Sequence, residues 1–547
     1  MFRRNSVMFT IKSVCLFLVW SIAAQTVKSE DSLTNIKTIV IESDEKWFGA
    51  VVTESDRMPF SDGYSFDLRG NTGGNQAAPL LLSTNGRFIW SDKAFAFQFK
   101  NNHIVVSGAT DSIYIEKAGK TISDAYFKAG SKFFPPSGKI PDSNLFVHPQ
   151  YNTWIELVYN QNQQDILKYA HAIVSHHFPP GVLMIDDNWA PYYGKFDFRR
   201  DRFPDPRSMI NELHQLGFKV MIWVCPFVSP DGEVFRKLAE KKYLLPDGKP
   251  VHNAHGTITT EPAIIKWWNG YSAVMDFSNP EAVSWYHGQL AAMTDSFGLD
   301  GFKFDAGDPE FYPPTSTPFK KVTANEQSEL WGSFGLLYPL NEYRAMWKRG
   351  GQPIAERLRD KANTWEDLQK LIPHITSSGL LGYAFACPDM IGGGEFGSFI
   401  GKDKLDQDLI VRSAQCSALM PMMQFSVAPW RVLDDPHLKA VHEAVALREI
   451  FVPYILKLAR SSAVSGMPIV RKMEFVFPHQ GLEDCKDQFM LGDSILVAPM
   501  LTTGTKRLVV FPKGKWIDDK GTVFVGPSKK EVTVALERLI WFRQEKK

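Results

Sequence analysis

The stretch Gly301–Asp308 reads Gly-Phe-Lys-Phe-Asp-Ala-Gly-Asp and lies just past the middle of the 547-residue chain. Its aromatic start and the turn residues after Asp305 are typical of a buried strand that delivers one carboxylate to its C-terminal end, where barrel proteins carry their functional groups. Lys303 shares a strand face with Asp305, so a cation beside the carboxylate would keep it ionised. The alternative is that Asp305 merely caps the next helix.

Apolar strands and amphipathic helices alternate on both sides of this stretch. Alternation over roughly 290 residues favours a parallel sheet, and the length suits a closed (β/α)8 TIM barrel. An open doubly wound sheet is the alternative, but no Gly-x-Gly-x-x-Gly turn follows an early strand. The predicted strands are Thr153–Val158, Val182–Ile185, Phe218–Val224, Val274–Phe277, Gly301–Phe304, Leu381–Phe385 and Met420–Phe425, and the predicted helices include Arg207–Leu216, Pro280–Phe297 and Trp365–Ile372.

Short strands separated by Gly, Asn and Asp turns lie before and after this region, and the chain is too long for a single core. We therefore predict an α/β fold with the barrel at residues 151–445. An N-terminal β-sandwich domain at 30–150 and a C-terminal β-sandwich region at 446–547 would flank it.

The first 29 residues predict a signal peptide. Arg3, Arg4 and Lys12 precede an apolar run at 14–24, and small or polar residues follow it. Since a membrane-spanning helix needs about 20 apolar residues, a signal anchor is the weaker alternative and we expect no stable membrane span. The segment predicts the secretory pathway, with the protein secreted or in the lumen of the endoplasmic reticulum or lysosome.

Composition argues against several classes of partner and cofactor. With 61 basic and 60 acidic side chains the net charge is +1, so we expect no nucleic-acid partner, while a homo-oligomer stays open. We expect no metal ion, because the cysteines lack metal-site spacing and are predicted to be buried free thiols. Three histidines fall in a helix and loop and are interpreted as structural. These residues are Cys225, Cys387, Cys416 and Cys485, and His171, His176 and His177.

Carboxylates follow several of the predicted barrel strands. Asp186 and Asp187 come after Ile185, Asp305 ends the central strand, and Asp389 follows another. In a barrel these strand ends converge on one cleft. Clustered carboxylates without His or Cys partners fit either an oxygen-ligand metal site or glycoside chemistry, which needs one anionic nucleophile and one protonated acid. Asp305 is the candidate nucleophile, and spacing alone leaves the second carboxyl open.

Three motifs resemble glycoside hydrolase family 31, and the resemblance runs from the N-terminal β domain to the end of the chain. They are Ile185-Asp-Asp-Asn-Trp189, Gly466-Met-Pro-Ile-Val-Arg471, and the very specific run from Asp487 to Pro499. The resemblance implies a carbohydrate substrate, hydrolysis with retention, and no cofactor.

The resemblance also implies individual roles. Asp305 matches the catalytic nucleophile, and Asp360, sixteen residues after Arg344, matches the acid/base carboxyl. Without the resemblance, structural roles would be at least as common: a loop cap, a core residue or an ion-pair partner. The implied substrate-binding residues are Asp186 or Asp187, Trp268, Lys303, Arg344, Arg357 and Asp389.

The sequence of the strand that carries the candidate nucleophile indicates which sugar the substrate would contain. Family α-glucosidases usually have Trp-x-Asp-Met-Asn-Glu here, whereas this chain has Phe-Lys-Phe-Asp-Ala-Gly-Asp; with Trp267-Trp-Asn-Gly270 this resembles the myogenesis-regulating glycosidase branch, associated with α-galactosides. Asp308 departs from that branch, which tends to have Glu there. We expect an exo-acting α-galactosidase, with an α-glucosidase or an inactive sugar-binding or folding-assistance protein as alternatives.

Overall fold

The computed structural model describes residues 35–252, 258–402 and 404–545. The predicted signal peptide at 1–29 lies outside these residues. No helix among the described residues is long and apolar enough to cross a membrane.

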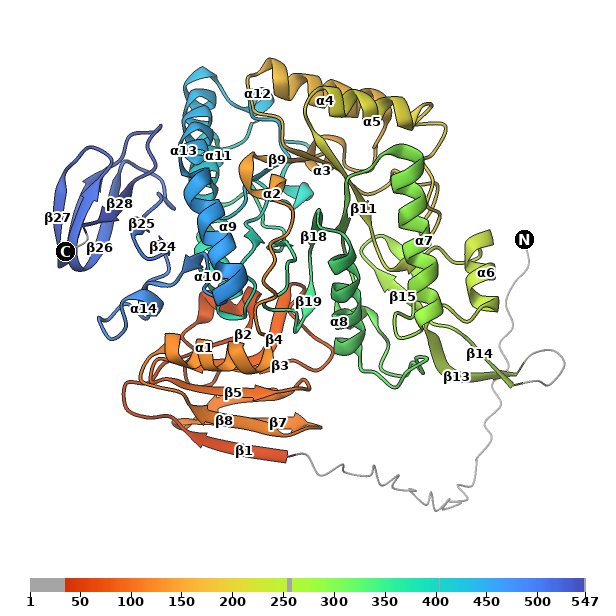
Figure 1. The fold of residues 1–547 in the computed structure, drawn as a ribbon, viewed down its shortest axis with the longest axis horizontal. Helices are drawn as coiled ribbons and strands as arrows, with labels where there is room; N and C mark the ends of the chain where they lie inside the picture. The colour runs from red at the N-terminus through yellow and green to blue at the C-terminus, as the bar shows by residue number, and fades with distance from the viewer. Residues whose placement is uncertain (1–34, 253–257, 403, 546–547) are drawn as a thin grey trace, which may run out of the picture. The chain divides into compact units, whose positions relative to one another are not determined.

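Two antiparallel sheets form the N-terminal part (Figure 1). One has the strand order β1-β7-β6-β3, and the other contains β4, β5 and β8, with β2 also paired to β4. In β7 alternate residues are buried, as expected for a strand with one face on the core. The strands are β1 Asn35–Val40, β2 Trp47–Val51, β3 Ser65–Asp67, β4 Gln76–Ser83, β5 Arg87–Ser91, β6 Ala96–Lys100, β7 His103–Ala109 and β8 Ile113–Lys117. Helix α1, Ile122–Phe133, follows them.

The centre is a sheet of eight parallel strands, which confirms the predicted barrel. The strand order is β21-β20-β18-β17-β11-β10-β9-β22, and the backbone of Ile391, just past β21, donates to Gln424 O of β22. Register places Trp223 opposite Lys303. The strands are β9 Gln150–Asn152, β10 Val182–Ile185, β11 Lys219–Val224, β17 Gly301–Phe304, β18 Asn341–Tyr343, β20 Glu356–Arg357, β21 Ala386–Cys387 and β22 Gln424–Phe425.

Helices lie between the barrel strands, and local capping sets their ends. In α7 the side chain of Asn279 accepts from Glu281 N, Pro280 occupies the first turn, and Gly298 ends the helix with φ 80°. The helices are α2 Asn144–Val147, α3 Trp154–Leu157, α4 Gln163–Ser175, α5 Pro206–Gln215, α6 Glu233–Glu240, α7 Pro280–Phe297, α8 Ala324–Phe334, α9 Trp365–Leu368, α10 Leu371–Leu380, α11 Gln407–Ala418 and α12 Pro429–Val432.

Three predicted barrel strands are wrong. Thr153–Val158 contains the short helix α3, and the first barrel strand is β9 just before it. Leu381–Phe385 is a turn that leads into β21. Val274–Phe277 lies at the end of β16, outside the barrel, in a small sheet inserted after β11. That insertion comprises β12 Phe227–Val228, β15 Ile264–Trp267 and β16 Gly270–Val274, beside the hairpin of β13 Pro246–His252 and β14 Ile258–Pro262.

The C-terminal part is a six-stranded sheet in the order β23-β24-β25-β28-β26-β27, with its own apolar core around Trp516. The 31-residue helix α13, Asp435–Ser465, leads into it and runs through the predicted boundary at 445, so the domain boundaries stay predictions. The other elements are β23 Val470–Arg471, α14 Met473–Val476, β24 Phe489–Leu491, β25 Ile495–Val497, β26 Lys506–Asp518, β27 Val523–Thr533 and β28 Trp541–Gln544.

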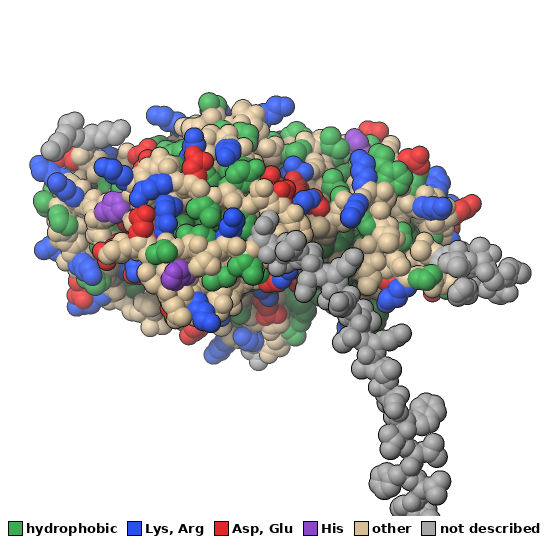
Figure 2. Space-filling view, turned by 90° about the horizontal axis from the view of Figure 1, so that it is seen from below, with side chains coloured by type: hydrophobic (Ala, Val, Ile, Leu, Met, Phe, Trp, Pro, Cys, Tyr) green, Lys and Arg blue, Asp and Glu red, His purple; other side chains and the backbone are tan. Residues whose placement is uncertain are grey.

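Three of the four described cysteines are buried free thiols, as predicted, and charged side chains of both signs are mixed on the surface drawn in Figure 2. On the face drawn in Figure 2, basic and acidic side chains are interspersed among apolar and neutral ones. Cys225, Cys387 and Cys416 are buried free thiols, and Cys485 is half-buried and free. His171 pairs with Glu212 at 2.7 Å, as a structural residue would.

One buried cation holds α13 to the barrel. Arg448 is 0% exposed, and its guanidinium donates to four backbone carbonyls: Ala418, Met420, Phe146 and Pro421, at 2.7–3.2 Å. It therefore joins α2, α11 and the approach to β22.

We predict that Arg448→Met lowers the free energy of unfolding by about 3 kcal/mol or more, because four buried carbonyls lose their donor. Urea unfolding followed by circular dichroism measures this. Arg460→Met, at an exposed position of the same helix, is the matched control and should stay within about 0.5 kcal/mol of the parent. Equal free energies of unfolding for the two variants would contradict the role of Arg448 in holding α13 to the barrel.

Candidate active site

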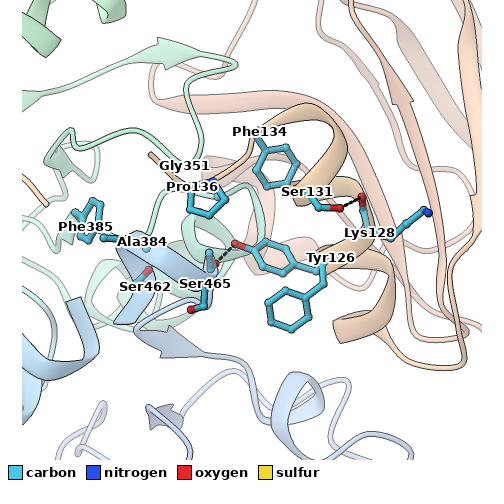
Figure 3. Close-up of a pocket in the computed structure, with 15 residues that line it drawn as sticks. Tyr126, Lys128, Ser131, Phe134, Pro136, Gly351, Ala384, Phe385, Ser462 and Ser465 are labelled. Carbon is cyan, nitrogen blue, oxygen red and sulfur yellow. Dashed lines mark hydrogen bonds between the residues drawn. The ribbon is translucent and has the colours of Figure 1, made fainter. Parts of the chain in front are cut away.

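The C-terminal ends of the barrel strands surround a pocket of about 320 Å³. The structure brings eight of the nine predicted site residues to its wall, and the ninth, Asp389, lies behind Arg357. A larger cavity of about 430 Å³ between α1 and the end of α13 has no acidic residue in its lining (Figure 3), so it is not a candidate for this chemistry. The eight residues are Asp186, Asp187, Trp268, Lys303, Asp305, Arg344, Arg357 and Asp360.

Asp305 directly follows β17, as predicted. Its Oδ2 accepts a 2.7 Å hydrogen bond from Trp223 Nε1, and its Oδ1 accepts from Ala306 N at 2.8 Å. Arg344 Nε lies 3.8 Å from Oδ1. Asp305 caps no helix, since Asp308 precedes the next one, so the structural alternative is wrong; these donors fix the orientation of the carboxyl group at the pocket wall.

The turn after Asp305 depends on its glycine. Ala306 and Gly307 both have positive φ, at 54° and 77°. A Cβ on Gly307 would lie 2.2 Å from Trp331 Cδ1. Only glycine therefore lets the chain turn here against the buried Trp331 ring, which sets the direction of Asp305.

Lys303 pairs with Asp186 rather than directly with Asp305. The Nζ–Oδ2 distance is 2.6 Å, and both side chains are 4% exposed. Burial lowers the pKa of Lys303, but the charges of Asp186, Asp305 and Glu342 together outweigh it and raise the pKa. The expectation that Lys303 shares the pocket face with Asp305 is confirmed, whereas the cation nearest to Asp305 is Arg344.

Asp187 lies in a small polar cluster at one side of the pocket. Its Oδ2 accepts from Tyr193 OH at 2.9 Å and from Asn269 Nδ2 at 3.0 Å. Burial raises the pKa of Asp187 to about 7, and the charge of Asp186 adds to the rise. Near neutral pH this carboxyl can carry a proton and donate a hydrogen bond.

Arg344 follows β18 and lies between two carboxylates. Its Nε is 3.8 Å from Asp305 Oδ1 and 3.5 Å from Asp308 Oδ2. The indole of Trp268, 44% exposed at the pocket rim, lies against the guanidinium at 4.7 Å. Asp308 is fully buried, and burial raises its pKa.

Arg357, at the end of β20, is shared by several acids. Its Nη1 donates to Asp360 Oδ1 and, at 3.0 Å, to Asp389 Oδ1, while its Nε lies 3.5 Å from Glu342. Asp360 is 31% exposed to the pocket, but Asp389 is buried and accepts from the backbone of Lys361, Met390 and Gly394.

The two carboxyls on Arg357 titrate together. Burial raises the pKa of Asp360, but the charges of Arg357, Arg344 and Lys303 outweigh it and lower the pKa to about 2. Burial and the charge of Asp360 raise the pKa of Asp389 to about 6. The pair therefore takes up one proton as the pH falls below about 6, and this proton lies on Asp389 rather than on Asp360.

Sequence reasoning missed several residues that line the pocket and one, Tyr193, that lies beside it. Trp223 holds Asp305, and Tyr193 holds Asp187, although neither was singled out. Trp223 lies within a predicted strand, and only the register that places it opposite Lys303 brings it to the nucleophile. Other lining residues are Trp154, Tyr159, Arg359, Met390, Glu395 and Phe396. Among the residues described, no group of three or more His, Cys, Asp or Glu is arranged to hold a metal ion.

Comparison with known proteins agrees with this geometry. The chain is 32% identical over 436 residues to the myogenesis-regulating glycosidase of Mus musculus, which covers 76% of this chain and 59% of that protein. It is 24% identical to alpha-glucosidase 2 of Bacillus thermoamyloliquefaciens over 80% of this chain and 60% of that one. The chain thus spans about three fifths of the length of these relatives.

The fold is also that of a solved structure. The Flavobacterium johnsoniae GH31 dextranase complexed with glucose superposes with a TM-score of 0.81 at 19% identity, over 94% of this chain and 67% of that one. Residues 149–458 match the glycosyl hydrolases family 31 TIM-barrel domain, and residues 466–545 match the family 31 C-terminal domain. A match over more than half of the chain, on a barrel that gathers the expected carboxylates, shows that the protein belongs to glycoside hydrolase family 31.

Proposed function

We propose that the protein is a retaining, exo-acting α-glycosidase that removes terminal α-linked hexose, with α-galactosides as the preferred substrates. The proposal rests on one observation: Asp305, which accepts a hydrogen bond from Trp223, and Asp360 lie in the wall of the same pocket. The pocket, at about 320 Å³, is at the small end of ligand pockets of roughly 300–1,000 Å³, which suits one terminal sugar.

In the first step Asp305 attacks the anomeric carbon as the glycosidic C–O bond breaks. Asp360 gives its proton to the leaving oxygen, so a covalent glycosyl-enzyme and a free alcohol form. Asp360 must hold the proton of its pair at this point, and Asp389 can take the negative charge because Arg357 and three backbone N–H groups donate to it.

In the second step water attacks the same carbon and displaces Asp305. Asp360 now takes the proton from the water, which returns both carboxyls to their starting states. No cofactor is needed. The hydrogen bonds from Trp223 and Ala306 orient the nucleophile, and the nearby charge of Arg344 favours the anion that leaves.

The remaining pocket residues suit hydroxyl recognition. Lys303 and Asp186 offer a donor and an acceptor side by side, Asp187 offers a carboxyl that can donate or accept, and Trp268 offers an apolar wall. The Phe-Lys-Phe-Asp-Ala-Gly-Asp strand supports the galactoside preference. The alternative is an α-glucosidase, supported by the similarity to a Bacillus α-glucosidase.

A third alternative is a sugar-binding or folding-assistance protein without turnover. The presence of both Asp305 and Asp360 argues against it. The N-terminal pattern of residues 3–24 further supports the secretory pathway as the compartment, secreted or lumenal.

Asp305→Asn should lower kcat by at least about 10³-fold, because an amide cannot form the glycosyl ester. Hydrolysis of a nitrophenyl glycoside measures this, and an unchanged thermal melting temperature shows that the fold is intact. Near-normal turnover in this variant would contradict the role of Asp305 as the nucleophile.

The pH profile should report the Asp360–Asp389 pair. Asp360 can donate a proton to the leaving oxygen only while the Asp360–Asp389 pair holds its proton. We therefore expect kcat/KM to fall as the pH rises through about 6. In Asp389→Asn the neighbouring negative charge is lost and Arg357 serves Asp360 alone, so the alkaline limb should move to lower pH. Asp295→Asn, on the exposed face of α7, is the control and should leave the limb in place. A limb that moves to higher pH in Asp389→Asn would contradict the shared proton.

A substrate panel separates the alternatives. We expect the purified protein to cleave nitrophenyl α-galactoside faster than the α-glucoside and α-xyloside. Preference for the α-glucoside would replace the galactoside proposal. Cleavage of none, together with binding of galactose or glucose in calorimetry, would favour the binding role.

A further inference from the structure

The N-terminal sheet reaches the catalytic pocket through one strand. After Arg344 the chain forms β19, Met346–Trp347, which pairs in parallel with β4 rather than with the barrel. Figure 1 shows β19 beside β4 at the junction of the two parts. The segment that carries Arg344 is therefore held by barrel strand β18 on one side and by the N-terminal sheet on the other.

Asn75, directly before β4, contacts the backbone of both pocket arginines. It is 0% exposed, and its Nδ2 donates to Arg344 O at 2.7 Å and to Arg357 O at 3.2 Å. Gln76 Nε2 donates to Arg344 O as well, at 3.1 Å. One amide group thus links two residues that are neighbours in the barrel sheet but thirteen positions apart in the chain.

The residue before Asn75 allows this close approach. Gly74 has a φ of 70°, and a Cβ built on it would lie 3.4 Å from Arg344 Nη2 and 3.6 Å from Asp308 Oδ1. The segment 74–76 therefore lies directly behind the guanidinium that faces Asp305. A larger residue at 74 would press on that group.

We propose that Asn75 is a positioning residue for the catalytic pocket: its side-chain amide fixes Arg344 and Arg357, so that the N-terminal domain sets the arrangement of cations around Asp305 and Asp360. This inference deepens the proposed function and rests on it for its effect on activity. Asn75 itself lies outside the pocket lining and acts through the two arginines.

Asn75→Ala tests the proposal, with Asn325→Ala as a matched control. Asn325 is a buried barrel residue that also joins the two parts by two hydrogen bonds, to Leu68 O and from Gly70 N, but these contact neither arginine. Both variants lose a pair of buried bonds at the same junction, so a merely structural role would affect them alike. Gln76→Ala, which removes one of the bonds to Arg344 O, is the milder variant if Asn75→Ala folds poorly.

In Asn75→Ala we expect kcat/KM to fall about ten-fold or more, since small displacements of positioned groups are costly. The alkaline limb of its pH profile should move to higher pH, because Arg357 then stabilises the Asp360 anion less. Asn325→Ala should keep the parent's limb and most of its kcat/KM. Equal losses in both variants, or an unmoved limb in Asn75→Ala, would overturn the proposal.

Crystal structures of the two variants decide the question independently of turnover. We expect the Arg344 and Arg357 side chains to shift or lose order in Asn75→Ala and to stay in place in Asn325→Ala. Arginines that stay in place in both variants would refute the positioning role. If the parent protein cleaves no glycoside, the proposed function fails, while these structures still test what Asn75 holds.

Discussion

The sharing of two arginines among four aspartates, three of them buried, is the constraint on which the rest of the site depends. Arg344 lies between Asp305 and Asp308, and Arg357 lies between Asp360 and Asp389. Carboxylates taken out of water cost several kcal/mol each unless a cation and hydrogen bonds compensate. Because each arginine lies beside two aspartates, a displacement of one guanidinium removes a nearby positive charge from both of them.

This arrangement explains why the pocket can hold acids in different states. Asp186 forms an ion pair with Lys303, whereas Asp187 accepts from neutral donors, the side chains of Tyr193 and Asn269 and the backbone of Asn188, and its pKa rises to about 7. At Arg357 two aspartates share one cation, and Asp389, with a pKa of about 6, keeps a proton more easily than Asp360. Anionic and protonated carboxyls can therefore coexist in one pocket.

The sequence was informative where a local signal was strong. The helix Pro280–Phe297 is observed as predicted because Asn279, Pro280 and Gly298 mark both of its ends. The strand Gly301–Phe304 is also observed as predicted, since an aromatic run stops at an Asp-Ala-Gly turn. In contrast, strands β18, β20 and β21 have two or three residues, which is too short for a periodic pattern.

The site was less predictable than the fold because its contacts cross strands. Family resemblance supplied Asp360 and Arg357, but that Arg357 also donates to Asp389 follows only from the side-by-side positions of β20 and β21. Likewise, Trp223 reaches Asp305 through the register of β11 and β17. Such contacts leave no trace in spacing along one segment.

Asp308 illustrates how the departure from a family pattern can be absorbed. It is fully buried, and its Oδ2 lies 3.5 Å from Arg344 Nε. Next to it, a Cβ built on Gly74 would lie 3.6 Å from Asp308 Oδ1, an ordinary van der Waals distance, so the glycine leaves room beside this carboxylate. The guanidinium of Arg344 lies between Asp308 and Asp305, so the shorter acid still holds this cation within 3.8 Å of Asp305.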